Sequence, residues 1–202
     1  TTEIYTLSLH DALPICVCLG PEPGRSFAEA KFDFPHLRDY VMDRNIMADV
    51  SETATTWTNL LPLYEDSLAD IDRAICNTGV ASWVGCHVSH SYPTGASLYF
   101  TFGCLQRAGR EIDQYLHIKK AAEDAFMKNG GTLSHHHAVG TEHLPWVEED
   151  VSPTGLKAVR AVKEGLDPRG IMNPGKIIPP ADPFKAWGLS GEALGRFTGS
   201  GL

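Results

Sequence analysis

The chain of 202 residues has the size of one ordinary domain or of a piece of a longer protein. Hydrophobic residues make up 43% of it and charged residues 21%, which is typical of globular proteins and excludes a disordered chain. The formal net charge is −8 and no cluster of Lys or Arg stands out, so nucleic acid is not an expected partner. No apolar run approaches the roughly 20 residues of a membrane-spanning helix, so we expect no membrane span.

The first fifteen residues differ in composition from the rest of the chain. They read TTEIYTLSLHDALPI and resemble the in-frame translation of a common DNA-sequencing adapter. We therefore expect residues 1–15 to be a foreign segment, followed by natural sequence that lacks its own N-terminus. A short natural strand and turn is the alternative. On the adapter interpretation, His10 and Asp11 belong to no active site.

Five cysteines occur at irregular spacing, and Cys16-x-Cys18 is their one close pair. An odd number without a second close pair fits neither a zinc ribbon nor a CxxC redox motif. Free thiols in a reducing compartment are the simplest explanation, and we expect a cytoplasmic protein.

Predicted helices and strands follow one another without a regular βαβ rhythm. Pro35 favours a helix start, and the pattern stays helical to about Asn45. The next expected elements are a strand over 46–55, a helix from Thr56, strands over 80–89 and 96–104 joined as a hairpin, a helix over 109–129 and a last helix over 153–166. From residue 179 the chain is rich in Pro and Gly, and we expect a loose tail over 179–202.

Apolar residues at helical spacing indicate the buried sides of two of these helices. In the helix from Thr56, which this threonine is expected to cap, they are Trp57, Leu61, Tyr64, Leu68 and Ile71. In the helix over 109–129 they are Ile112, Tyr115, Ala122 and Phe126, and Gly130-Gly131 is a natural helix end. We interpret both stripes as core packing. The fold class that follows is α+β, with an antiparallel sheet flanked by helices.

Three adjacent histidines, His135, His136 and His137, follow the di-glycine turn. Imidazole titrates near neutral pH, so such a run can move protons or bind a metal. Neighbouring side chains of an extended segment point to opposite faces, so His135 and His137 would share one side and His136 would face the other. A zinc site made of neighbours alone has poor geometry and needs a further histidine close in space. The candidates are His87, His90 and His143. We assign no metal site from the sequence, and a solvated loop without a role stays an alternative.

Two further side chains could take part in chemistry. Tyr99 lies between Leu98 and Phe100 in a predicted strand, so its ring points away from theirs and can act as an acid or base once cations or hydrogen bonds lower its pKa. Arg38 could hold a phosphate through its two-pronged guanidinium. The alternatives are a packing role for Tyr99 and a simple ion pair of Arg38 with Asp39.

Five segments, in this order along the chain, resemble the C-terminal domain of the alkyldihydroxyacetonephosphate synthase family. They are residues 35–39, 52–57, 86–101, 130–140 and 166–176. The last segment contains Asn-Pro-Gly-Lys and is similar to the terminal signature of FAD-linked oxidases of the vanillyl-alcohol-oxidase superfamily. By itself it indicates only that superfamily. The His-His-His element with Tyr99-Phe100 upstream is more specific, and the resemblance runs from about Pro21 to Ile178.

The resemblance implies one part of a two-domain flavin enzyme. In that family an N-terminal domain binds FAD, and a C-terminal cap covers the flavin ring and forms the substrate site. Residues 16–178 would be the cap, and the N-terminal FAD-binding domain would be missing, so FAD would be bound mainly outside this chain and the chain alone would be inactive. The family reaction exchanges the acyl chain of acyl-dihydroxyacetone phosphate for a fatty alcohol in ether-lipid synthesis, which makes these two molecules the expected substrates.

The resemblance also implies roles for individual residues. By motif match, Tyr99 would be the catalytic tyrosine, His135, His136 and His137 the active-site histidines, Arg38 a substrate-binding arginine and Asn173 a residue close to the flavin. One departure is Ala138, where the family usually has Gly.

Two alternatives to this function stay open. A flavin dehydrogenase for a 2-hydroxy acid such as D-lactate or 2-hydroxyglutarate shares the Asn-Pro-Gly-Lys ending, although such enzymes usually carry Glu-His-Gly where this chain has His136-His137-Ala138. A stand-alone metal- or protein-binding module without catalysis is the other. Peripheral contact with a membrane and a homodimer are compatible with either flavin enzyme.

Overall fold

The computed structural model describes residues 19–33 and 36–186, and these form two compact units that divide between Tyr40 and Val41. The first unit contains α2 (Glu22–Ala30) and most of α3 (Leu37–Met42). Residues 1–15 and the predicted helix start at Pro35 lie outside the described residues.

The helix predicted to run to about Asn45 is shorter than expected, because α3 ends at Met42. Asn45 has φ 58°, a left-handed conformation that a helix cannot contain. None of the helices in the described part of the chain is long and apolar enough to cross a membrane.

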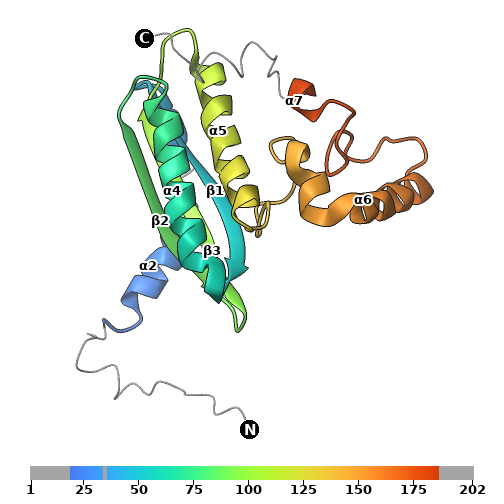
Figure 1. Cartoon of the computed structure of the whole chain (residues 1–202). Coiled ribbons are helices and arrows are strands. Elements are labelled where there is room, and N and C mark those ends of the chain that lie inside the picture. The colour runs from blue at the N-terminus through green and yellow to red at the C-terminus, as the bar shows by residue number, and fades with distance from the viewer. Residues whose placement is uncertain (1–18, 34–35, 187–202) are drawn as a thin grey trace. The chain divides into compact units, whose positions relative to one another are not determined.

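The second unit confirms the predicted α+β class (Figure 1). Its elements are β1 (Ile46–Thr56), η1 (Trp57–Asn59), α4 (Leu60–Cys76), β2 (Ser82–Ser91), β3 (Gly95–Leu105), α5 (Glu111–Lys128), η2 (Leu144–Trp146), α6 (Val147–Leu166) and α7 (Pro183–Ala186). Helix α6 starts earlier than predicted, but Ser152 with φ 68° interrupts it, so that the predicted start at Pro153 marks its second part.

The strands of this unit form an antiparallel sheet in the order β1-β3-β2, and α4 and α5 pack on one of its faces (Figure 1). Side chains alternate along β3, and Leu98, Phe100 and Phe102 point to the helices. They meet a layer of buried apolar side chains that includes Leu63, Ile71, Ile75, Ile118 and Phe126. Burial of this layer stabilises the sheet against both helices.

The apolar stripe predicted for α4 is correct in its second half and wrong in its first. Tyr64, Leu68 and Ile71 pack in the core, whereas Trp57 and Leu61 are exposed. For Trp57 the difference arises because it belongs to the short turn η1 and helix α4 begins only at Leu60, after Asn59 rather than after a cap at Thr56. Both exposed side chains line a hollow of about 360 Å³ beside β2. In α5, likewise, Ile112 at the first turn is exposed.

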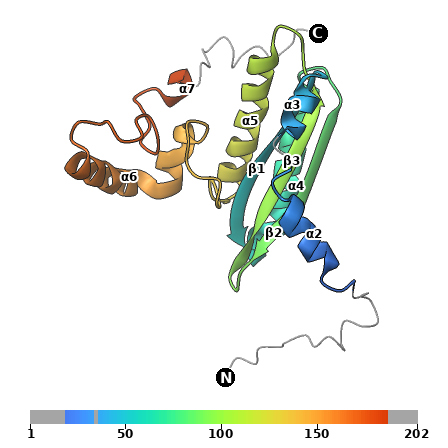
Figure 2. The same ribbon diagram turned by 180° about the vertical axis from the view of Figure 1, so that it is seen from behind.

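The opposite face of the sheet carries polar side chains, and Figure 2 shows the sheet from the side away from α4. Glu52 of β1 and His87 of β2 are both paired with Tyr99 on the central strand β3. A bulge between Val88 and His90 shifts the register of β2, so that His90 is paired with Ser97. Residues of all three strands thus share one face.

A second, smaller apolar cluster lies beyond α5. It contains Leu133, Trp146, Val147 and Leu156, with Phe184 of α7 packed against it. The ring of Phe184 meets that of Trp146 edge-on at 5.5 Å between centroids. The start of the segment predicted as a loose tail is therefore folded, and the cluster fixes Leu133, two residues before His135.

Candidate active site

The three histidines follow a turn that is attached to the edge of the sheet. Helix α5 ends as predicted, and Gly130 has φ 71°. A Cβ atom on Gly131 would lie 2.4 Å from Oγ1 of Thr53, so only glycine fits there. The backbone N–H of Thr132 donates to the carbonyl oxygen of Ala54 at 3.0 Å, and Oγ1 of Thr53 donates to the carbonyl of Thr132 at 2.7 Å. These bonds attach the turn to strand β1, so that the chain passes around the edge of the sheet to its polar face.

All three imidazoles converge on one carboxylate, that of Glu52. The distances are 3.4 Å from His135 Nδ1 to Oε1, 2.8 Å from His136 Nδ1 to Oε2 and 3.7 Å from His137 Nε2 to Oε2. The side chain of Glu52 is fully buried. The expectation that His136 faces away from its neighbours is wrong, because the segment is bent rather than extended and all three rings turn to the same charge.

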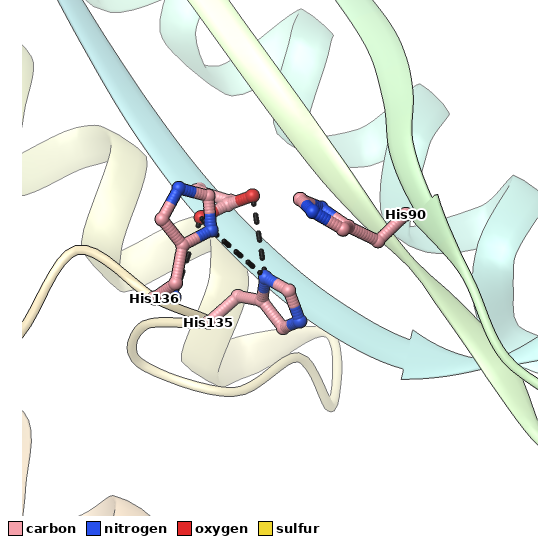
Figure 3. Close-up of side chains that lie close together, drawn as sticks. His90, His135 and His136 are labelled. Atoms are coloured by element: carbon pink, nitrogen blue, oxygen red, sulfur yellow. Dashed lines mark hydrogen bonds and ion pairs between the residues drawn. The ribbon is translucent and has the colours of Figure 1, made fainter.

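A second layer of polar groups surrounds this cluster. The hydroxyl of Ser89 donates to Oε1 of Glu52 at 2.9 Å, and the hydroxyl of Tyr92 lies 2.7 Å from Nε2 of His135. His90 joins from β2, with its ring 5.0 Å from that of His135 and 5.4 Å from that of His136 between centroids. Figure 3 shows His90, His135 and His136 grouped together, with rings from a strand and from the loop facing each other.

Tyr99 and His137 lie next to each other at the border of the cluster. Their rings meet edge-on at 5.4 Å between centroids, and Tyr99 also contacts the ring of His87 at 5.1 Å. The structure thus brings together four of the residues singled out in the sequence, namely Tyr99, His135, His136 and His137. An imidazole beside a phenol on a partly open face can transfer protons to and from a bound molecule.

The protonation of these groups follows from their surroundings. Burial by itself raises the pKa of Glu52, but hydrogen bonds from Ser89 and from the backbone of His136, with the charges of His136 and His137, outweigh it and hold the pKa below its usual value. Burial lowers the pKa of His137, although Glu52 opposes this effect. Burial and then the charges of Glu52 and Asp49 raise the pKa of Tyr99. This direction is opposite to the lowered pKa considered from the sequence, so Tyr99 keeps its proton and can donate a hydrogen bond to a bound molecule.

The other residues singled out in the sequence lie elsewhere. Arg38 belongs to α3 in the first unit and is exposed, and its role stays a prediction. Asn173 is exposed on the turn after α6, with φ 47°, and its place beside a flavin also stays a prediction. Ala138 has φ 58°. A left-handed backbone suits glycine best, so the departure from glycine expected from the resemblance leaves Ala138 in a strained conformation.

A buried charged network lies on the other side of β1, toward α5. Nζ of Lys119 donates to the carbonyl of Val50 at 2.7 Å and to Oγ of Ser51 at 2.8 Å, and lies 3.3 Å from Oδ2 of Asp49. Glu123, 1% exposed, accepts a bond from Ser51 at 3.2 Å. Because Ser51 directly precedes Glu52, this network holds the strand that carries the buried carboxylate.

Sequence reasoning missed Glu52, Ser89 and Tyr92 as parts of the site. Glu52 lies among Ser, Thr and Ala in a predicted strand, and a single acidic residue in such a strand is expected to be exposed to solvent. One signal was present: Glu52 is two residues from Val50 and Ala54 and so shares their face, which is not the face of Ser51 and Thr53. Only the pairing of β1 with β3 shows that this face carries Tyr99.

Comparison with known proteins identifies several relatives of this chain. The chain is 38% identical over 161 residues to alkyldihydroxyacetonephosphate synthase of Dictyostelium discoideum, and 37% identical over 162 residues to the enzyme of that name from Trypanosoma brucei brucei. Each match covers 80% of this chain and 26% of the relative, so the chain spans about a quarter of their length. Glycolate oxidase subunit GlcD of Bacillus subtilis is 29% identical over 171 residues, which cover 83% of this chain and 33% of GlcD.

A solved structure of an alkyldihydroxyacetonephosphate synthase has the same fold over this region. It superposes with a TM-score of 0.54 at 32% sequence identity, over 75% of this chain and 24% of the other. Residues 22–177 match the family described as FAD linked oxidases, C-terminal domain. Because this match includes both the histidine segment and the strands that surround it, the chain belongs to the C-terminal domain family of the FAD-linked oxidases.

Proposed function

We propose that this chain is the substrate-covering part of an FAD-dependent enzyme that makes the ether bond of ether lipids. In this reaction the oxygen of a fatty alcohol forms a bond to the carbon of dihydroxyacetone phosphate that carries the acyl group. The bond from that carbon to the acyl oxygen breaks, and the fatty acid leaves. The proton of the alcohol must leave its oxygen and ends on the released acid or on a group of the protein, so the site needs proton carriers.

The adjacent Tyr99 and His137 are the observation that carries this proposal. Their rings meet edge-on on the face of the sheet away from α4 and α5, and the side chain of His137 is 27% exposed, so a bound molecule can reach both. The phenol of Tyr99 keeps its proton and can donate a hydrogen bond, and the neutral imidazole of His137 beside it can accept a proton. Similarity to proteins named alkyldihydroxyacetonephosphate synthase supports this choice of reaction, and its substrates are part of the proposal.

The remaining two histidines act as positioning residues in this scheme. His135 and His136 hold the loop to Glu52, and their contacts to the buried carboxylate fix the direction of the neighbouring His137. Placement within a few tenths of an ångström matters for proton transfer, because the transfer needs hydrogen-bond distance to the reacting atom.

FAD would lie on the polar face of the sheet, with its flat ring against the ring of Tyr99 or that of His137, since these two rings are nearly perpendicular to each other. In our proposal these two residues, with Asn173, contact the flavin, and the rest of the cofactor is bound outside the chain. Bound FAD would supply a conjugated ring that exchanges electron density with the substrate carbon. Arg38 would bind the substrate phosphate with two parallel hydrogen bonds.

Oxidation of a 2-hydroxy acid is the second candidate, since GlcD matches over most of this chain. The two functions differ in one measurable respect, because the oxidation reduces the flavin and the alkyl transfer leaves it oxidised overall. Flavin absorbance therefore separates them.

A chimaera tests the proposal. Residues 22–177 replace the matching segment of the Dictyostelium enzyme, so that the FAD-binding part comes from the relative. We expect the purified chimaera to contain FAD and to form alkyl-dihydroxyacetone phosphate from the acyl compound and a fatty alcohol, without bleaching of the flavin by D-lactate or glycolate. A chimaera that contains FAD but makes no ether, or whose flavin is reduced by a hydroxy acid, would contradict the proposal. The unmodified Dictyostelium enzyme is the control.

A further inference from the structure

We infer that Glu52, His90, His135 and His136 form a binding site for a divalent transition-metal ion, with Zn²⁺ as the best fit. Each of these residues offers one ligand atom, and the four atoms all lie within 4.8 Å of one another. This inference does not depend on the proposed function, because it rests on the cluster alone.

The separations inside the cluster are close to those of a metal site. Zinc bonds of about 2.0–2.1 Å in a tetrahedron place neighbouring ligand atoms roughly 3.3 Å apart. Here Nδ1 of His135 lies 3.1 Å from Nδ1 of His136, and the two nitrogens lie 3.4 Å and 2.8 Å from the oxygens of Glu52. These separations agree with that estimate to within about half an ångström; the one from His135 ends on Oε1 of Glu52 and the one from His136 on Oε2, so either oxygen can be the carboxylate ligand. His90 supplies the fourth ligand (Figure 3).

The hydrogen bonds that His135 and His90 form to residues around the cluster leave the other nitrogen of each ring available to a metal ion. Nε2 of His135 is bound to the hydroxyl of Tyr92 at 2.7 Å, and Nδ1 of His90 lies 3.2 Å from Oγ of Ser89 and 3.4 Å from Oγ of Ser97. Metal-bound histidines commonly use their second ring nitrogen in this way, which fixes the ring and directs the free lone pair to the metal. Ser89 also bonds to Glu52, so one hydroxyl orients two of the four ligands.

The kind of ligand selects the kind of ion. Three imidazoles and one carboxylate suit Zn²⁺ and its neighbours among the transition metals, whereas Mg²⁺ and Ca²⁺ prefer a shell of oxygen atoms. The charge balance is favourable as well, because a buried carboxylate with three neutral rings leaves one negative charge for the cation to neutralise. The half-exposed ring of His136, at 53%, lies on the side from which an ion can enter.

The proposed site stays separate from the Tyr99 and His137 pair. His137 approaches Glu52 only to 3.7 Å and is not one of the four ligands. A bound ion would hold His135 and His136 in place and leave His137 to face the open side. The sequence could not assign this site, since the neighbouring histidines needed partners from β1 and β2 that are 45 residues or more away in the order of the chain.

Titration of the 202-residue chain with Zn²⁺ by calorimetry tests the inference, with Co²⁺ absorption as a report of tetrahedral geometry. We expect one ion per chain and binding weakened more than tenfold in His90→Ala and in Glu52→Gln, since even loss of an outer partner costs about 10–100-fold in affinity. His87→Ala is the matched control on the same strand and should keep its affinity to within about twofold.

Several results would overturn the site. The first is that the wild-type chain does not bind Zn²⁺ stoichiometrically. The second is that only one of His90→Ala and Glu52→Gln loses affinity for Zn²⁺. The third is that His87→Ala loses as much affinity as His90→Ala. Circular dichroism checks that each variant is folded. If Glu52→Gln unfolds, His135→Ala takes its place in the comparison, and the same criteria apply.

Discussion

Nδ1 of His136 lies 2.8 Å from Oε2 of Glu52, although 84 residues separate them in the chain. The carboxylate is buried and charged, and an isolated charge in such a place is strongly unfavourable. The contacts of the carboxylate with Ser89 and with the surrounding imidazoles offset the free-energy cost of burying its charge. The same contacts fix the position of the histidine loop. The loop and strand β1 therefore depend on each other.

Replacement of Glu52 by Gln tests this dependence. The amide can still accept the bond from Ser89 but loses the charge that attracts the imidazoles, and hydrogen bonds to charged groups are the stronger ones. We expect a loss of about 1–3 kcal/mol in the free energy of unfolding and faster amide hydrogen exchange over residues 135–137. Glu65→Gln on the exposed side of α4 is the control and should change neither quantity. Unchanged protection of the loop in Glu52→Gln would show that the carboxylate does not hold it.

Ala138→Gly should stabilise the protein. With φ at 58°, Ala138 holds a left-handed conformation that costs about 1–2 kcal/mol for a residue with a Cβ atom, and the greater chain entropy of glycine offsets about 0.5–1 kcal/mol of the gain. A net rise of about 1–2 °C in Tm follows, measured by differential scanning calorimetry. Ala158→Gly, at an exposed position inside α6, should instead lower Tm. A decrease in Tm for both variants would disprove the argument from backbone strain.

The sequence predicted the elements of the sheet well and the contacts of the site poorly, for identifiable reasons. The hairpin of β2 and β3 follows from alternating side chains around Tyr92-Pro93-Thr94-Gly95, which is local information. The direction of the three imidazoles depends on a carboxylate from another strand, and no local pattern contains it. The exposure of Trp57 shows the same limit, because helical spacing cannot indicate that a short turn precedes α4.

The buried Glu123 should make stability depend on pH. Burial raises its pKa to about 8 from 4.5, and the nearby negative charges of Glu142 and Asp49 add to this effect, whereas Lys119 and the hydroxyl of Ser51 oppose it. A pKa that is higher in the folded than in the unfolded protein gives stability that is complete below pH 4.5 and is lost as the pH rises to 8.

The comparison of Glu123→Gln with the wild type isolates this effect. Other groups around Glu123, such as His143 at 3.9 Å, titrate in both proteins, so only the difference between the two is informative. We expect nearly equal free energies of unfolding at pH 4.5 and a more stable Gln variant at pH 8, from urea denaturation at several pH values. Glu65→Gln, exposed on α4, should give a difference that does not change with pH. A difference for Glu123→Gln that shrinks toward pH 8 would mean that the carboxyl is ionised and well paired when buried.

Tyr99→Phe in the FAD-containing chimaera should separate chemistry from packing. The substitution removes one hydroxyl and keeps the ring that meets His137 and His87, so the fold and the flavin content should not change. Proton transfer by a positioned side chain contributes roughly 10²–10⁴-fold to a rate, and we expect kcat for ether formation to fall within that range. Tyr64→Phe removes the same group on the other side of the sheet, where Tyr64 stacks on Phe100, and should leave kcat unchanged. Near-full activity of Tyr99→Phe would make this tyrosine a packing residue, and His137→Ala would then show whether the imidazole alone carries the proton.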